Sequence, residues 1–173
     1  MLHDVGGNGG EFDVSDEAFS ELLEKLGRKN LVRLENWEKE DEFIALTIDD
    51  VPETFYKNAY PLLVSYGYPF TIFVSVSLLN TPGYITTAQL KEMSESPFCT
   101  VGSHGVSHTF FAEMKEEEAL ADLEKSKSQL ESLIGKKLSC MHSRMALIMH
   151  VDLKTSIWWQ KFINMVLAQW LAQ

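Results

Sequence analysis

Two short stretches of the sequence carry side chains that could hold a metal ion. Residues 103–108 read SHGVSH, which places His104 and His108 four positions apart. Asp49 and Asp50 are adjacent and directly follow an apolar run. Two neutral imidazoles and one carboxylate suit a catalytic zinc ion, because three protein ligands leave one position open for water. A second carboxylate outside the ligand set could then accept a proton from that water as a general base.

Each pair also has an ordinary structural explanation when it stands alone. Consecutive aspartates after a strand often cap the next helix, because their side chains accept hydrogen bonds from its first amides. Two histidines in a loop of small residues are often polar residues with no ligand. Both explanations stay open until the fold decides whether the two pairs meet.

The elements expected around these residues alternate between strands and helices. Apolar, β-branched runs predict buried strands at residues 42–48, 70–76 and 98–103, and a fourth that begins at residue 136. Apolar residues at helical spacing predict helices at residues 14–27, 53–67, 86–96 and 114–135. Pro61 should kink the second helix, and the glycine-rich residues 1–12 are predicted as a loop. Such alternation is typical of βαβ units and of a parallel sheet or barrel.

A parallel arrangement would bring the two pairs together. In parallel α/β folds, functional groups gather at the carboxyl ends of the strands. Asp49 and Asp50 end the first buried strand, whereas His104 and His108 follow the third. The sequence therefore favours a single site at one edge of the sheet.

Composition narrows the class of protein. The chain has 173 residues, of which 45% are hydrophobic and 23% charged, so it can form one domain with a real core. Its formal net charge of −10 argues against nucleic acid and anionic membrane surfaces as partners, because both need a basic face. The sequence contains no run of about 18 apolar residues, so no membrane span is predicted. Cys99 and Cys140 are predicted as buried thiols, and the absence of a signal-peptide pattern favours the cytoplasm.

The order of three segments resembles the polysaccharide deacetylase superfamily, the NodB-homology domains of carbohydrate esterase family four. The segments read LTIDDVPE, YPLLVSYGYPFTIFV and VGSHGVSHTFF. TIDD is similar to the first family motif, usually T-F-D-D, and SHGVSH to the second, H-[ST]-x-x-H, in loose form. The resemblance covers about residues 1–140. It implies an α/β fold, a distorted parallel (β/α) barrel with fewer than eight strands, here incomplete at its C-terminus.

The resemblance also implies roles for the residues that match the motifs. The metal ligands would be Asp50, His104 and His108, and the metal would be zinc, with cobalt or nickel as alternatives. Asp49 would be the catalytic base, and Ser107 would steady the histidine loop by hydrogen bonding. The start, MLHDV, is similar to a YH[DS]V element of some members and would place His3 near the pocket. The implied reaction is hydrolysis of an N- or O-acetyl group on a carbohydrate substrate.

The sequence departs from the family in several places. Val51-Pro52 stands where the family has glycine, so the loop after the aspartates differs. The third motif, approximately [FR]-x-x-P-[YF]-G, and a later leucine-x-histidine motif that carries the general acid do not occur in this sequence. Residues 1–140 are therefore predicted as the N-terminal part of a deacetylase-like domain, and residues 141–173 as a helical tail foreign to the family.

A change of reading frame near residue 140 would explain the missing motif. Codons for Met-His-Ser-Arg-Met-Ala at residues 141–146 allow Ala-Phe-Pro-Tyr-Gly when they are read two bases later. On this hypothesis the chain is a truncated deacetylase with little activity and weak or absent metal binding. An uncovered strand edge could then let copies associate, with the oligomeric state left open. The alternative for the tail is a natural, divergent amphipathic helix.

Two other functions stay open for the chain as a whole. A protein of the same fold could bind glycan or metal without turnover. A hydrolase of another C–N amide bond would use the same metal chemistry on a different substrate.

Overall fold

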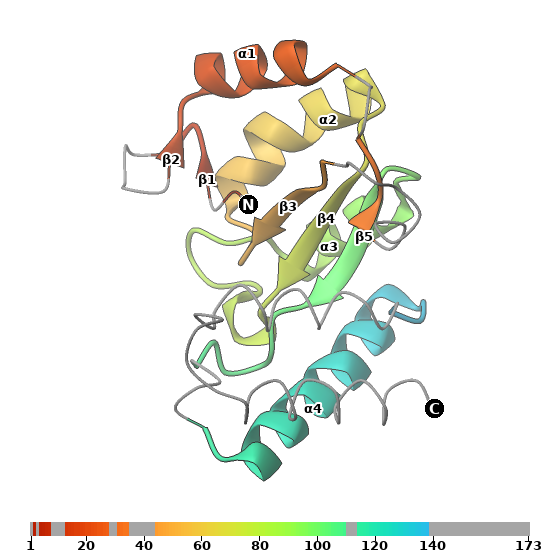
Figure 1. Ribbon diagram of the computed structural model, residues 1–173. Coiled ribbons are helices and arrows are strands. Elements are labelled where there is room, and N and C mark those ends of the chain that lie inside the picture. The colour runs from red at the N-terminus through yellow and green to blue at the C-terminus, as the bar shows by residue number, and fades with distance from the viewer. Residues whose placement is uncertain are drawn as a thin grey trace, which may run out of the picture.

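A parallel three-stranded sheet lies at the centre of the part of the chain that the computed structural model describes, residues 2, 4–7, 13–27, 31–34, 44–109 and 114–138. Its strands, in spatial order, are β3 (Leu46–Asp49), β4 (Phe70–Val74) and β5 (Cys99–Ser103) (Figure 1). Almost every residue in them is buried, as is typical of parallel strands covered on both faces. The predicted parallel α/β fold is confirmed, and the described strands form an open sheet rather than a closed barrel.

Three of the predicted strands are corrected by the structure, and the second of them ends at Val74 rather than at residue 76. β3 begins at Leu46, because Ile44 pairs only with Leu31 in an isolated bridge before the regular ladder starts. The fourth predicted strand is not present at residues 136–138, and its remaining positions, with Cys140 and the predicted tail, lie outside the described residues. Within those residues β5 pairs with β4 alone, so association of copies through its other edge stays a prediction.

The N-terminal segment adds short strands that the sequence pattern does not predict. β1 (Asp4–Val5) pairs in parallel with β2 (Asp13–Val14). Leu2 lies alongside β3, where its N–H donates to the Thr47 carbonyl and its own carbonyl accepts from the Asp49 N–H. The predicted N-terminal loop is therefore wrong at these positions, because strands of two residues are too short to show alternation.

The first helix, α1 (Asp16–Leu26), forms as its sequence predicts. The Ser15 hydroxyl accepts a hydrogen bond from the Ala18 N–H at 3.2 Å, which satisfies one of the amides left free at a helix start. Gly27 ends the helix with φ 55°, a backbone conformation that glycine adopts without strain. Both the predicted cap and the predicted stop are confirmed.

The second predicted helix is divided at Pro61. A π-helical turn, η2 (Phe55–Ala59), precedes α2 (Tyr60–Tyr66), and the Tyr60 N–H donates to the Phe55 carbonyl across the wider turn. Proline has no N–H, so it is tolerated in the first turn of a helix and not in the interior. Pro61 therefore marks the beginning of α2 rather than a kink in one continuous helix.

The remaining helices cover the sheet on the side of β5. A short 3₁₀ turn, η3 (Val76–Leu78), follows β4, and α3 (Thr87–Glu95) begins with a capping box between Thr86 and Gln89. The long helix α4 (Glu116–Ile134) packs against both α3 and β5. In Figure 1, α1 and α2 lie above the sheet and α4 below it. No helix formed by the described residues is long and apolar enough to cross a membrane.

The core fills the space between these helices and the sheet. Its largest fully buried side chains include Phe19, Phe55, Phe70, Phe73, Ile48 and Leu90. On α4 the buried stripe contains Leu123, Leu130 and Ile134. Leu133 lies at the margin of that stripe and is 38% exposed.

The two leucines at the end of α4 test this assignment of the buried face. Leu130→Ala should lower the free energy of unfolding by about 2–5 kcal/mol, because it removes a fully buried side chain and leaves a cavity. The matched control Leu133→Ala, on the exposed margin of the same helix, should lower it by less than about 1 kcal/mol. Urea unfolding followed by circular dichroism measures both values, and equal losses would contradict the assignment.

Candidate metal centre

The end of β4 brings the two predicted pairs of residues to one edge of the sheet. The Asp50 N–H donates to the Phe73 carbonyl at 3.0 Å, and the His104 N–H donates to the Val74 carbonyl at 2.9 Å. Consecutive carbonyls of the central strand therefore fix the backbone of both segments. As predicted for carboxyl ends of parallel strands, Asp50 and His104 lie on neighbouring sides of β4.

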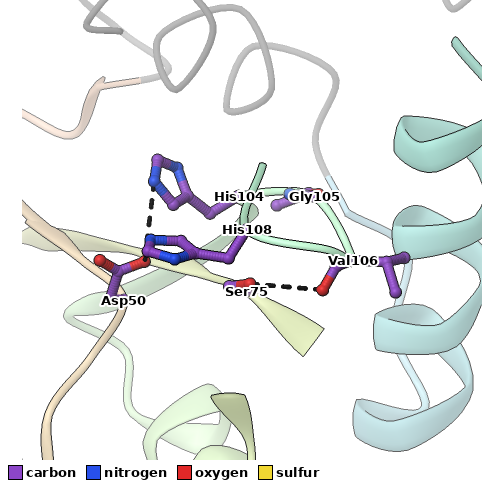
Figure 2. Close-up of polar contacts among 7 residues, drawn as sticks. Asp50, Ser75, His104, Gly105, Val106 and His108 are labelled. Carbon is purple, nitrogen blue, oxygen red and sulfur yellow. Dashed lines mark hydrogen bonds and ion pairs between the residues drawn. The ribbon is translucent and has the colours of Figure 1, made fainter. Parts of the chain in front are cut away.

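Three side chains converge there. Asp50 Oδ1 lies 3.0 Å from His108 Nε2 and 3.7 Å from His104 Nε2, as Figure 2 illustrates for Asp50 and the two rings. The ligand atoms that the three residues offer all lie within 4.8 Å of one another. The side chains of His104 and Asp50 are 5% and 15% exposed, whereas that of His108 is 41% exposed. The cluster is thus closed on its inner side and accessible from solvent beside His108.

The donor set fits a divalent metal ion. Ligands about 2.0–2.1 Å from a tetrahedral zinc ion lie about 3.3 Å apart, and the two measured separations, 3.0 and 3.7 Å, bracket this value. Asp50 Oδ1 is buried and makes no hydrogen bond of acceptable geometry with the described residues. Buried carboxylate oxygens rarely lack a partner, so this atom is suited to a cation.

Asp49, the predicted base, is a fully buried carboxyl group. Neither of its oxygens has a hydrogen-bond partner among the described residues. Burial, and secondly the negative charge of Asp50, raise the pKa of Asp49 from 3.8 to about 7. A carboxyl group with such a pKa can hold or release a proton near neutral pH, which is the property that general base catalysis requires. Its catalytic role stays a prediction.

The backbone around the aspartates is strained. Asp50 has φ 62° and Val51 has φ 56°, in the left-handed region that residues with a Cβ rarely adopt. A β-branched residue such as Val51 is least suited to it, and its complete burial in the core offsets the strain. The family that the sequence resembles has glycine at the position of Val51, and glycine would adopt the same φ without strain.

Ser107 and His3 are the other two residues that the sequence predicts for the site. The Ser107 hydroxyl makes no hydrogen bond to another described residue, whereas the Ser107 N–H donates to Asp122 Oδ1 at 3.2 Å. The loop is therefore held through a backbone amide and a helix carboxylate, and the steadying role of the Ser107 hydroxyl stays a prediction. His3 lies outside the described residues.

Two residues near the site carry no signal in the sequence. Asp122 stands among the many acidic residues of α4, which read as one solvated face. Tyr84 follows a proline-glycine turn, and an antiparallel bridge joins its backbone to that of Pro52. Burial, followed by the negative charges of Asp50 and Asp4, raises the pKa of Tyr84. Its phenol therefore lies within electrostatic reach of Asp50 in the candidate metal centre.

Comparison with known proteins identifies the family. The family model for polysaccharide deacetylases matches residues 37–146, which include both aspartates and both histidines. The chain belongs to the polysaccharide deacetylase family. A putative polysaccharide deacetylase of Bacillus subtilis, YxkH, is 23% identical over 120 residues, which are 69% of this chain and 42% of that protein. The chain thus spans less than half the length of this curated relative.

Solved structures share the fold. The deacetylase PplD of Streptococcus pyogenes, solved in complex with acetate, is 18% identical, with a TM-score of 0.69 over 87% of this chain and 78% of that one. IcaB from Ammonifex degensii is 20% identical, with a TM-score of 0.67 over 86% and 80% of the two chains. A polysaccharide deacetylase of Bacillus cereus is 22% identical, with a TM-score of 0.68 over 88% and 54%. The fold of this deacetylase family member is therefore that of known polysaccharide deacetylases.

The buried Asp49 makes stability depend on pH. Because its folded-state pKa is raised from 3.8 to about 7, folding favours the protonated carboxyl group. The metal-free chain should therefore lose stability from this group as pH rises from about 4 to about 7. Asp49→Asn removes the titrating group, so the melting temperature of the variant relative to wild type should rise across that interval and stay level above it. Thermal melts with a chelator at about pH 5 and about pH 8 measure the difference, and a difference that does not change with pH would contradict the burial of an ionisable group.

Proposed function

We propose that the chain carries the metal-binding half of a deacetylase site that hydrolyses N- or O-acetyl groups on a carbohydrate. The observation that carries this proposal is the convergence of Asp50, His104 and His108 at one sheet edge in a member of the polysaccharide deacetylase family. Zinc suits two imidazoles and a carboxylate, and cobalt or nickel could replace it. Acetate, the molecule in the Streptococcus pyogenes structure, is the product that such a hydrolase would release.

The residues of the site divide the chemistry between them. Asp50, His104 and His108 would hold the ion, which would supply Lewis acidity and lower the pKa of water. A carboxylate oxygen of Asp49 would accept the proton from the attacking water, and the positive charge of the nearby ion would favour the ionised form that this role needs. Adjacent aspartates can take these separate roles because their side chains leave the backbone in different directions. The open side of the cluster at His108 gives the substrate access.

The missing third motif limits the activity that we expect from this chain. We propose that residues 1–140 are the N-terminal part of the deacetylase domain and that the codons after residue 140 carry the rest in a shifted frame. Without the later motifs, groups that stabilise the developing charge and protonate the leaving group would be lost. Each such loss typically lowers turnover by about 10²–10³-fold. The coding DNA tests the proposal directly, because a stop codon soon after the motif in the shifted frame would contradict it.

Metal binding is the first measurable consequence. Truncation alone led us to expect weak or absent metal binding, but because the three ligands converge, the purified chain should bind one equivalent of zinc or cobalt. His104→Ala should weaken binding by more than about 100-fold, since losing a ligand exceeds the loss of a supporting contact. Glu124→Ala, an exposed acidic residue on α4, is the matched control and should bind as wild type does. Isothermal titration with a competing chelator measures the affinities. Equal affinity in wild type and His104→Ala would place the metal elsewhere.

Acetate release tests the reaction class. The 173-residue chain should deacetylate N-acetylated oligosaccharides slowly, and a chain expressed from the frame-restored gene should be at least about 100-fold faster. Asp49→Asn in the restored chain should retain metal and abolish turnover. A panel of acetylated sugars and small amides, with acetate or ammonia measured by coupled assay, distinguishes the carbohydrate deacetylase from the alternative functions. Turnover of the amides alone would indicate another C–N hydrolase, and metal binding with no turnover in the restored chain would indicate a non-catalytic protein.

A further inference from the structure

The loop between the two histidines has its backbone amides bound from the side of α4. The Val106 N–H donates to Asp122 Oδ2 at 2.8 Å, and the Ser107 N–H donates to Asp122 Oδ1 at 3.2 Å. Each oxygen of this carboxylate thus accepts one amide of the segment that joins His104 to His108. Hydrogen bonds to an ionised carboxylate are stronger than those between neutral groups, so this pair holds the loop firmly.

The carbonyl groups of the same loop are bound from the opposite side. The Val76 N–H donates to the Gly105 carbonyl at 3.1 Å, and the Ser77 N–H donates to the Val106 carbonyl at 3.0 Å. The Ser75 hydroxyl also donates to the Val106 carbonyl at 3.5 Å, the contact drawn as a dashed line in Figure 2. The turn after β4 and the helix α4 therefore hold the loop between them.

A second residue of α4 supports the beginning of the loop. The Gly105 N–H donates to the Ser103 hydroxyl at 3.1 Å, and this hydroxyl bonds to that of Ser126. Ser126 is completely buried, one turn beyond Asp122, within a stripe of the helix that is otherwise apolar. With the His104 amide bound to Val74, the amides of residues 104–107 all have partners, which is the pattern of an ordered loop.

We propose that Asp122 is a positioning residue that sets the separation of the two histidine ligands before the metal binds. The inference rests on the proposed metal-binding function of Asp50, His104 and His108. His108 has φ 54°, a backbone conformation that an unsupported loop rarely keeps. A loop held in this form binds the ion without a further loss of conformational freedom, whereas a loop released from α4 must be ordered when the ion enters.

Metal affinity and ligand geometry test the proposal. Asp122→Ala removes both acceptors and should lower cobalt affinity by about 10–100-fold, the usual effect of losing a group that orients metal ligands. Asp122→Asn keeps one acceptor oxygen, so its cobalt affinity should lie between those of wild type and Asp122→Ala. The visible absorption spectrum of cobalt-loaded Asp122→Ala should differ in intensity from that of cobalt-loaded wild type, because the spectrum reports the arrangement of the ligands. Metal-free variants should retain the circular dichroism of wild type.

Two controls separate positioning from a loss of stability. Leu130→Ala destabilises the same helix without touching the loop, so its cobalt spectrum and affinity should match wild type once the protein is folded. Glu124→Ala removes an exposed carboxylate from the same helix and should change neither. Wild-type affinity and spectrum in Asp122→Ala, or an equal fall in Leu130→Ala, would overturn the proposal.

Failure of the proposed function has a different signature. If wild type itself binds no cobalt, the metal-binding proposal fails. Amide hydrogen exchange then tests whether Asp122 orders the loop between the histidines. Protection of the Val106 and Ser107 amides in wild type, lost in Asp122→Ala and kept in Glu124→Ala, supports the loop-ordering role. Unprotected amides in wild type would overturn it.

Discussion

The structure of the site depends on hydrogen bonds from two consecutive carbonyls at the end of β4. Phe73 binds the Asp50 amide and Val74 binds the His104 amide, so one strand end fixes segments that are far apart in the chain. Because the three strands are parallel and in register, both segments leave the sheet at the same edge. The rest of the centre, including the His108 loop and its contacts with α4, is built outward from that alignment.

Features that suit the site for chemistry oppose the stability of the fold. Asp49 is a carboxyl group buried without a hydrogen-bond partner among the described residues, and Val51 is a β-branched residue in the left-handed region. Burial of apolar side chains such as Ile48 and Phe55 elsewhere in the core offsets these costs. A bound cation would relieve part of the electrostatic cost, since a positive charge beside Asp49 and Asp50 favours their ionised forms.

Helix α4 serves the core and the site with different residues. Leu123, Leu130 and Ile134 bury its apolar stripe, whereas Asp122 and Ser126 turn polar groups toward the loop that carries the histidines. The helix is therefore more than a cover for the sheet, because its packing and the loop geometry are linked. Membership of the deacetylase family agrees with this arrangement.

The sequence alone determined most of the longer elements and the candidate ligands. Apolar runs located β3, β4 and β5, Ser15 and Gly27 marked the ends of α1, and the order of TIDD and SHGVSH led to Asp50, His104 and His108. Local patterns carry such information because caps, periodicity and motifs lie within a few residues of one another. Only the tertiary structure decided which polar groups meet. The π-turn before Pro61, the raised pKa of Asp49 and the contact of Asp122 with the histidine loop all depend on packing between segments that are distant in sequence, and no local pattern encodes them.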